Sequence, residues 1–223
     1  MDKKLKVTFH GETDMLHSWD NIYWRENVSG WQKDPANRTK KVAGDDRCPA
    51  WGWMGRMYTE NGVVCVPSDN LQKCLSEGGA KVGTGKTMGD RSYKKLVQSY
   101  MLVNESSWPL LVNGSPIDAA KLHATLSQES DFKVHEEVVS NAGFTLFLKP
   151  VRIGKAKHIR VRPRFSNWSV SGTITVFDTE VITMDTCKTI LEYAGICGLG
   201  DWRPSSPNAP GLFGRFSAEV SNA

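Results

Sequence analysis

The sequence predicts an α+β protein with an antiparallel sheet that is covered on one face by helices. Three observations support this fold class. Residues 5–11 alternate between apolar and polar side chains, as in a half-buried strand. Residues 63–75 combine a short buried strand with a helix. A long strand-like stretch, 158–183, precedes another helix and a final strand. Because the strands outnumber the helices and the helices lie between strands, this layered arrangement buries the apolar surfaces best.

The first strand leads into a long insertion. Leu5, Val7 and Phe9 alternate with polar residues until Gly11 ends the strand. Residues 12–60 then show neither a helical nor a strand period, so we expect an irregular insertion wrapped on a core. This tryptophan-rich segment contains Trp19, Trp24, Trp31, Trp51 and Trp53.

The middle of the chain is expected to be less regular. Val63–Val66 reads as a buried strand, and Ser68 is placed to cap a helix that ends before Gly78 and Gly79. Residues 79–95 are rich in glycine and lysine, which indicates a second, exposed insertion. Strand-like runs follow at 98–103, 110–112, 132–139 and 144–148.

The C-terminal third carries the strongest pattern. The strand signal at 158–183 is broken near Asn167, and Asp185 or Thr186 is placed to cap the next helix. A glycine-bounded loop follows, and residues 212–220 predict a final strand. Glycines on both sides of a loop indicate sharp turns or close backbone contacts.

Composition excludes several classes of protein. The 223 residues are 39% hydrophobic and carry a net charge of +4, which is typical of a folded chain and too small to indicate a polyanionic partner by itself. No run is apolar enough to span a bilayer, and the N-terminus has no signal-peptide core, so we expect a cytoplasmic protein without membrane contact. The five cysteines form no Cys-x-x-Cys pair, which favours reduced thiols over disulfides or a metal site.

A basic stripe is the first candidate binding site. Because side chains alternate along a strand, four basic residues share one face while Ile159 and Val161 point to the other. The stripe consists of His158, Arg160, Arg162 and Arg164. Same-face residues lie roughly 6–7 Å apart, close to the spacing of phosphates in an extended strand. Trp168 lies beyond the stripe as a candidate stacking platform. The plainer interpretation is an edge strand kept soluble by charge.

A second basic segment invites a nucleotide-binding interpretation, which we reject. Gly83–Thr87 ends like a phosphate-binding loop, but the required first glycine is Ala80, and no buried strand precedes it. We expect instead a basic loop available to phosphates. Its candidate ligands are Lys81, Lys86, Arg91, Lys94 and Lys95.

No catalytic constellation stands out. The chain shows no Ser-His-Asp order, no metal-spaced histidine cluster and no obvious carboxylate pair, so we expect no catalytic residue, metal or cofactor. His10, His17 and His158 are the histidines nearest the suspected binding segments.

Three features resemble the RAMP superfamily, the RNA-binding proteins of CRISPR effector complexes. They are the strand ending at His10-Gly11, the Val64–Pro67 strand with its helix, and a closing Gly-Leu-Gly and Gly-Leu-Phe-Gly-Arg-Phe pattern. The backbone subunit, which polymerises along guide RNA, is most similar, and residues 14–17 and Gly-Asp-Trp-Arg-Pro also resemble phage-encoded proteins of this type. The resemblance implies one ferredoxin-like (RRM/RAMP-type) domain over 1–223, with insertions at 12–60 and 79–95.

The same resemblance implies a non-enzymatic protein that binds single-stranded RNA or DNA and assembles as a homo-oligomer along the strand. A glycine-rich loop would bring backbone amides close to the nucleic acid. Its candidate residues are Gly198, Gly200, Trp202, Arg203, Gly211, Gly214 and Arg215.

Two other functions stay open. The first is a metal-independent RAMP-type endoribonuclease in which His10, His17 or His158 acts as general acid or base. The second is a phage structural or interaction protein that uses the tryptophan-rich insertion against another protein. Phosphate contacts and stacking serve RNA and DNA alike, so the residues favour neither.

Overall fold

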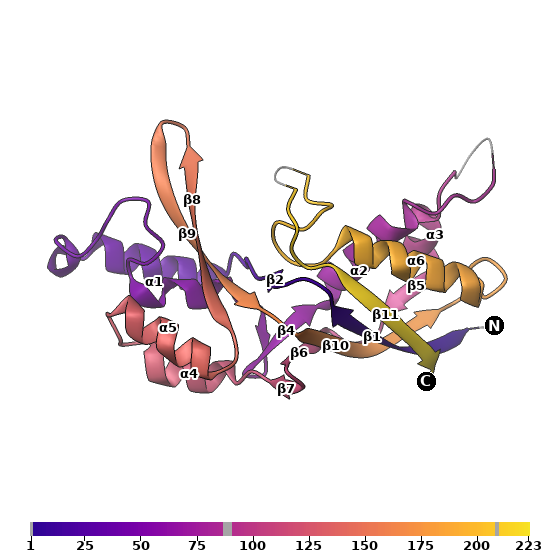
Figure 1. The fold of residues 1–223 in the computed structure, drawn as a ribbon, viewed down its shortest axis with the longest axis horizontal. Helices are drawn as coiled ribbons and strands as arrows, with labels where there is room; N and C mark the ends of the chain where they lie inside the picture. Colours follow the sequence, from indigo (N-terminus) through magenta and orange to yellow (C-terminus); the bar gives the residue numbers. More distant parts are fainter. Residues whose placement is uncertain (1, 87–90, 208–209) are drawn as a thin grey trace. The chain divides into compact units, whose positions relative to one another are not determined.

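A computed structural model describes residues 2–86, 91–207 and 210–223 (Figure 1). The chain forms two compact units, each built from separate stretches of sequence. Unit 1 comprises residues 1–15, 65–116 and 166–223, and unit 2 comprises residues 16–64 and 117–165. Strands and helices alternate along the chain, and the pairing in unit 1 is antiparallel, so the predicted α+β class is confirmed.

Unit 1 is built on an antiparallel sheet. Its strands are β1 (Lys3–Gly11), β4 (Val63–Pro67, whose first two residues belong to unit 2), β5 (Met101–Val103), β6 (Ser107–Val112), β7 (Ser115–Pro116), β10 (Trp168–Val176) and β11 (Phe216–Asn222). Its helices are α2 (Ser68–Gly79), α3 (Lys94–Tyr100) and α6 (Met184–Cys197). The sheet order is β11-β1-β10-β6-β4, and β5 also pairs with β10. With α2 after β1 and α6 between β10 and β11, the chain order gives a ferredoxin-like βαββαβ arrangement.

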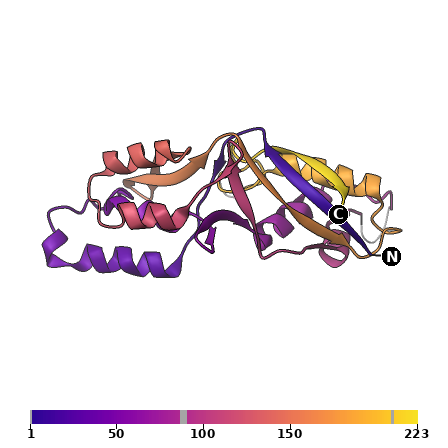
Figure 2. The same cartoon turned by 90° about the horizontal axis from the view of Figure 1, so that it is seen from below.

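The core of unit 1 lies between the sheet and α2 and α6, which lie side by side on one face (Figures 1 and 2). Along β1, Leu5 pairs with Ile174 and Phe9 pairs with Val170, and all four side chains are buried. The polar side chains that alternate with these apolar ones face away from this core. On that outer face the hydroxyl groups of Thr8 and Ser171 lie 2.8 Å apart. The apolar alternation of β1 therefore serves a sheet covered on one face.

One glycine of β10 permits a close contact within this core. An added Cβ at Gly172 would overlap the indole of Trp108, which is fully buried. Trp108 donates its indole N–H to the carboxylate of Glu105 at 2.9 Å, and Glu105 also accepts from the backbone N–H of Thr173. The missing side chain at Gly172 thus makes room for a ring whose position is fixed by a hydrogen bond.

Unit 2 contains most of the tryptophan-rich insertion and the segment that separates β7 from β10. Its elements are β2 (Met15–Leu16, at the boundary with unit 1), α1 (Ile22–Lys33), the 3-10 helices η1 (Pro35–Asn37) and η2 (Ala50–Arg56), β3 (Thr59–Glu60), α4 (Ala119–Leu126), α5 (Phe132–Asn141), β8 (Thr145–Ile153) and β9 (Ala156–Phe165). β8 and β9 form an antiparallel hairpin, and β2 pairs with β9. Trp53, Phe144 and Phe165 are buried at the centre of the unit.

Three regions differ from the sequence-based expectations. Residues 12–60 contain helix α1, which Asn21 caps by accepting from the amides of Tyr23 and Trp24. Residues 98–103, expected to be a strand, begin with the end of α3 and are extended only over 101–103. Residues 132–139, also expected to be a strand, form α5, in which His135 and Val139 are buried. His135 and Val139 are four positions apart, which is the spacing of residues on one face of a helix.

None of the helices in the described residues is both long enough and apolar enough to cross a membrane.

Candidate nucleic-acid interface

The basic stripe lies on β9 with the predicted alternation. Val161 and Phe165 are fully buried on one face, whereas Arg160, Arg162 and Arg164 are partly exposed on the other. This confirms that the arginines share one face of a strand with an apolar underside. An acidic residue from another part of the chain, however, lies beside the basic stripe.

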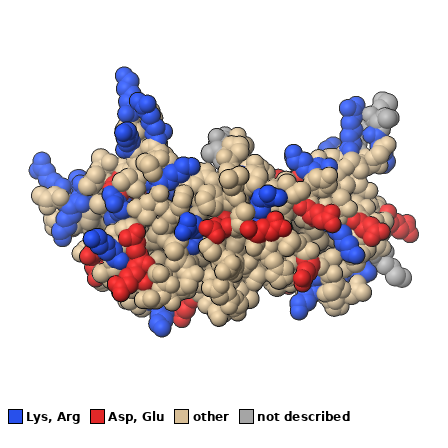
Figure 3. Space-filling view, viewed as in Figure 1, with Lys and Arg blue, Asp and Glu red and all other residues tan. Residues whose placement is uncertain are grey.

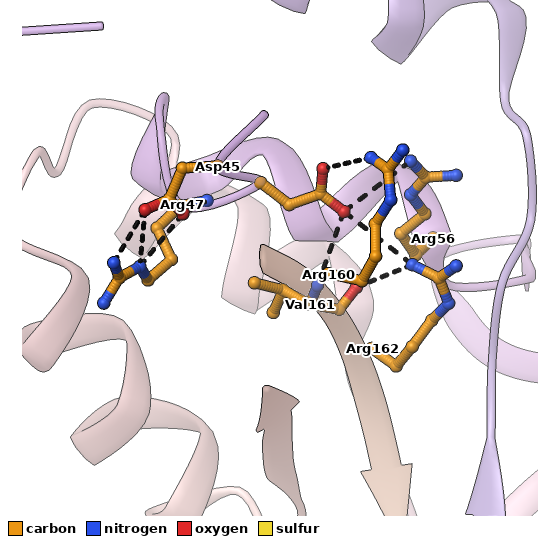
Figure 4. Close-up of polar contacts among 7 residues, drawn as sticks. Asp45, Arg47, Arg56, Arg160, Val161 and Arg162 are labelled. Atoms are coloured by element: carbon orange, nitrogen blue, oxygen red, sulfur yellow. Dashed lines mark hydrogen bonds and ion pairs between the residues drawn. The ribbon is translucent and has the colours of Figure 1, made fainter. Parts of the chain in front are cut away.

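Asp46 places a carboxylate among the arginines of the stripe. Its Oδ1 accepts from the guanidinium of Arg160 at 2.7 Å, and its Oδ2 lies 3.8 Å from Arg162. A third arginine, Arg56 from η2, lies 3.9 Å from Oδ2. Figure 4 shows Arg56, Arg160 and Arg162 turned toward one carboxylate, whereas Arg47 faces Asp45. We call Asp46, Arg56, Arg160 and Arg162 the arginine cluster.

Backbone pairing holds Asp46 in this place. The amide of Ile159 donates to the carbonyl of Gly44 at 2.8 Å, and the amide of Asp46 donates to the carbonyl of Ile159 at 3.0 Å. The Oδ2 atom of Asp46 also accepts from the amide of Val161 at 3.4 Å. Gly44 has a φ of 76° and lies against the ring of His158, where a side chain would not fit. The loop is therefore fixed as an extra, short strand beside β9.

The cluster has more positive than negative charge, and it is partly withdrawn from water. The exposed fractions are 17% for the side chain of Asp46, 28% for Arg160 and 11% for Arg162. Burial lowers the pKa of the Arg56 guanidinium, and the neighbouring charge of Arg162 lowers it further. Within the cluster, the carboxylate of Asp46 faces three guanidinium groups, and the charge of Asp20 acts on Arg56 as well.

A cavity of about 340 Å³ adjoins the cluster within unit 2. Its lining includes Trp19, Trp24, Arg56, His158 and Arg160. It therefore combines aromatic rings with two arginines of the cluster, and its lining also includes three aspartates, Asp20, Asp45 and Asp46. Sequence reasoning missed Trp19, Trp24, Asp46 and Arg56 as site residues, although it singled out the insertion for its tryptophans.

Arg164 and the end of the hairpin extend the basic surface. Arg164 donates to the hydroxyl of Thr145 at 3.0 Å, and its guanidinium lies 5.9 Å from the centre of the Phe147 ring. Arg152 pairs with Lys157 across the hairpin, and Lys149 pairs with Arg160. Figure 3 shows lysine and arginine side chains gathered at the end of this hairpin.

The second basic segment belongs to unit 1, whereas the stripe belongs to unit 2. Thr84 and Tyr93 donate backbone hydrogen bonds to Arg91 and Val82, so the stretches 82–84 and 91–93 lie antiparallel to each other. Residues 87–90 lie outside the described residues. The candidate lysines and arginine are all exposed: Lys81, Lys86, Arg91, Lys94 and Lys95.

The glycine-rich loop of unit 1 is closely packed onto the protein. Arg203 donates to Glu77 at 3.0 Å, and the hydroxyl of Ser205 donates to the same carboxylate at 2.6 Å. This carboxylate fixes the guanidinium of Arg203 against α2. Trp202 adopts a left-handed backbone conformation with a φ of 48° and is partly exposed, and Arg215 is exposed.

The glycine amides of this loop were expected to approach a nucleic acid, but three of them donate within the protein. Gly198 donates to Ala194, Gly211 to Arg203 and Gly214 to Asp14, at 2.9, 3.2 and 2.7 Å. Added Cβ atoms at Gly211 and Gly214 would overlap backbone carbonyls, so both glycines permit close chain packing. Gly200 has a φ of 81°.

Trp168 requires a correction. Its side chain is 2% exposed, and its indole N–H donates to the carbonyl of Thr13 at 2.8 Å. It belongs to the core of unit 1 and cannot offer a face to a base.

The three candidate histidines occupy different environments. His17 is buried, and burial lowers its pKa to about 3, so it is neutral near neutral pH and has no access to a substrate. His10 is on the surface beside Glu219, with 3.5 Å between nitrogen and oxygen. His158 lines the cavity. Burial thus argues against His17 as a general acid or base, whereas His10 and His158 stay candidates for that role.

The described residues contain no group of three or more His, Cys, Asp or Glu placed to hold a metal ion. None of the five cysteines forms a disulfide, and burial raises the pKa of the Cys74 and Cys187 thiols, the latter to about 11. Both thiols are therefore poor nucleophiles at neutral pH.

Comparisons with known proteins leave the family open. No protein-family model matches the chain, and no curated protein matches it. Among solved structures, Cmr6 from Pyrococcus furiosus is similar at a TM-score of 0.35 and 9% identity, over 98% of this chain and 99% of that one. A TM-score this low does not establish a common fold, and we infer nothing about this chain from the likeness.

Proposed function

We propose that this protein binds single-stranded nucleic acid without cleaving it, and that the arginine cluster of unit 2 holds the phosphates. The main support for this proposal is that Arg56, Arg160 and Arg162 all converge on the carboxylate of Asp46. Asp46 holds the arginines in one place, because all three lie within 4 Å of its carboxylate. A preorganised, partly desolvated group of guanidiniums is a favourable site for phosphate oxygens.

The remaining basic groups would lengthen the track for the strand. Arg164 continues the stripe along β9, His158 precedes it, and the lysines and arginine near the end of the hairpin extend it. In unit 1, the exposed basic side chains of residues 81–95, with Trp202 and Arg215, remain candidates for further phosphate or base contacts. The ferredoxin-like order of unit 1 agrees with the RAMP resemblance of the sequence motifs. We extend the proposal accordingly to assembly of several copies along one strand.

A binding experiment tests the proposal directly. Fluorescence anisotropy would be measured with labelled single-stranded RNA, single-stranded DNA and duplex, each at two salt concentrations. We expect binding to a single strand that weakens with salt, because each phosphate contact releases counterions. The RNA is run on a gel afterwards, and cleavage would contradict the non-enzymatic part of the proposal.

The matched variants are Arg160→Gln with Arg162→Gln, and Lys188→Gln as a control. Glutamine is preferable to glutamate in the cluster, because a new carboxylate beside Asp46 would unfold the loop as well as remove the charge. Lys188 is an exposed residue of α6 in unit 1. The cluster variant should lose at least tenfold in affinity and show a shallower salt dependence, whereas Lys188→Gln should bind like the wild type. Equal affinities for all three proteins would refute the site.

A further inference from the structure

We infer that the cavity of unit 2 receives one unpaired nucleobase of the bound strand, while the phosphate next to that base lies on Arg56 and Arg160. This inference rests on the proposed function and adds a base-binding subsite to it. The ligand is thus a nucleobase that carries a phosphate, delivered as part of a strand. A free nucleotide has the same chemistry and is the alternative source that the experiment separates.

The cavity has rings that are already fixed in place. Trp19 stacks on Tyr58 with 5.7 Å between ring centres and an angle of 23° between the planes. Trp24 lies 5.6 Å from the ring of Trp51 and meets His123 edge-on at 5.4 Å. Rings held by neighbouring rings lose little freedom when a base stacks on them, so they are suited to bind an unstacked base.

Local backbone features place Trp24 at the cavity. Asn21 accepts from the amide of Trp24 at 3.3 Å and so fixes the first turn of α1. On the other side, a Cβ at Gly55 would lie 2.5 Å from the Cβ of Trp24, so only glycine lets η2 approach this closely. The tryptophan is therefore held between a helix cap and a glycine of the opposite wall.

Two arginines link the cavity to the arginine cluster. Arg56 and Arg160 both line the cavity and both face Asp46. A base and its phosphate are joined through one sugar, so a site that holds both must place an aromatic wall close to cationic groups. The lining of this cavity brings Trp19 and Trp24 together with Arg56 and Arg160. The three aspartates of the lining, Asp20, Asp45 and Asp46, are each paired with an arginine. Its volume of about 340 Å³ falls within the range of pockets that bind small molecules.

The first test compares strands with and without bases. An oligoadenylate of the sugar type that binds is compared with a strand of the same length and backbone in which abasic residues replace the nucleotides. Both carry the same phosphates, so contacts of the arginine cluster alone would give equal affinities. We expect the strand with bases to bind about tenfold or more tightly, in keeping with the usual contribution of base–aromatic stacking.

Tryptophan variants then test whether the preference for the strand with bases arises in the cavity. Trp24→Leu and, separately, Trp19→Leu should reduce the ratio of the two affinities toward one while leaving the salt dependence unchanged. Trp31→Leu is the matched control, because Trp31 lies on the same helix as Trp24 but does not line the cavity. It should keep the wild-type ratio. Circular dichroism melting of each variant separates a lost base contact from a lost fold, and the comparison of strands on the wild-type protein needs no variant.

The outcomes separate this inference from the proposed function. Equal binding of the two strands by the wild type, or a preference that both cavity variants retain, overturns the base subsite and leaves the phosphate site standing. Absence of salt-sensitive binding to either strand overturns both. Adenosine monophosphate is the third probe, and if it binds more tightly than the strand, the cavity belongs to a free nucleotide and the strand assignment is wrong.

Discussion

Asp46 and Arg160 form a 2.7 Å ion pair that joins the loop of residues 44–46 to strand β9 in the middle of the basic stripe. The same aspartate pairs with β9 through its backbone and lies near two more arginines. It therefore both neutralises part of the stripe and determines where the guanidinium groups lie. A stripe of free charges would be flexible, whereas this cluster is preorganised.

Replacement of Asp46 by a neutral residue should make the stability of the protein depend on a bound anion. In Asp46→Asn, three partly buried guanidiniums lose the carboxylate on which they converge, and we expect the free energy of unfolding to fall by about 1–3 kcal/mol. Phosphate or sulfate should restore part of that loss by occupying the vacated position. Thermal melts in phosphate and in chloride at equal ionic strength measure this effect.

Sulfate and phosphate stabilise many proteins by exclusion from the surface, so the comparison needs a reference. The wild type and Asp185→Asn, which alters an exposed carboxylate of α6, supply it. The gain in melting temperature from phosphate should be larger for Asp46→Asn than for either reference. The same gain in all three proteins would show that the cluster has no particular affinity for anions.

The contact between Gly172 and Trp108 predicts that a glycine-to-alanine substitution lowers stability at Gly172 but not at an open position such as Gly30. Gly172→Ala would place a methyl group within the indole of Trp108, and we expect a loss of about 1–3 kcal/mol in the free energy of unfolding. Gly30→Ala places the same methyl group on α1, with no atom within 4 Å, and should be neutral or stabilising by up to about 1 kcal/mol. Urea denaturation, followed by tryptophan fluorescence, measures both, and a neutral Gly172→Ala would contradict the packing described for β10.

Buried histidine should make the protein sensitive to acid. The Nδ1 atom of His17 accepts from the amide of Tyr58 at 3.4 Å, and burial holds its pKa at about 3 against an ordinary 6.5. The unfolded chain binds a proton more readily, so stability is complete above about pH 6.5 and falls by up to about 1.4 kcal/mol per pH unit as the pH drops toward 3. His135, whose pKa burial also lowers, acts in the same direction.

Melting temperatures between pH 8 and pH 4 measure this dependence. His17→Asn removes one titrating group but keeps an acceptor for the Tyr58 amide. Its melting temperature should fall less steeply with pH than that of the wild type, although it begins lower because the ring contacts with Tyr58 and Phe165 are lost. Parallel slopes for the two proteins would argue against a neutral, buried His17.

The contacts of Arg203 predict that its main effect is on stability. The guanidinium and the hydroxyl of Ser205 share the carboxylate of Glu77, and the arginine side chain is 17% exposed. Arg203→Gln should lower the free energy of unfolding by about 1–3 kcal/mol and leave affinity for a single strand nearly unchanged. Arg160→Gln should lower affinity. Anisotropy and urea denaturation on both variants check the contrast, and a weaker affinity in Arg203→Gln at full stability would restore its binding role.

Much of the fold could be predicted from strands whose side chains alternate. β1, β9 and β10 bury one face each, so their apolar period of two is visible in the sequence. Helix α1 is less evident, because none of its residues is fully buried and only Trp24, Val28 and Trp31 recur at helical spacing. In α5 the buried face includes a histidine that accepts from Trp53, a partnership that only the folded chain reveals.

The candidate site was predictable only in part, for a related reason. Alternation along β9 indicates that Arg160 and Arg162 share a face, since that relationship is local. Asp46 and Arg56 reach the same place from more than 100 positions away in the chain, by backbone pairing of one loop and the turn of a 3-10 helix. No spacing rule connects them, so the carboxylate within the stripe could not be foreseen.

The interleaving of the two units has a consequence for synthesis of the chain. Strand β1 leaves the ribosome long before its two neighbours, β10 and β11, which are formed by residues 168–176 and 216–222. The two stretches of unit 2 can meet only after residues 117–165 have been made. Translation must therefore reach residue 176 before one edge of β1 can be covered, and the last strand before the other can. The nascent chain carries an unpaired, alternating apolar strand throughout that time, which makes it a natural client for a ribosome-associated chaperone.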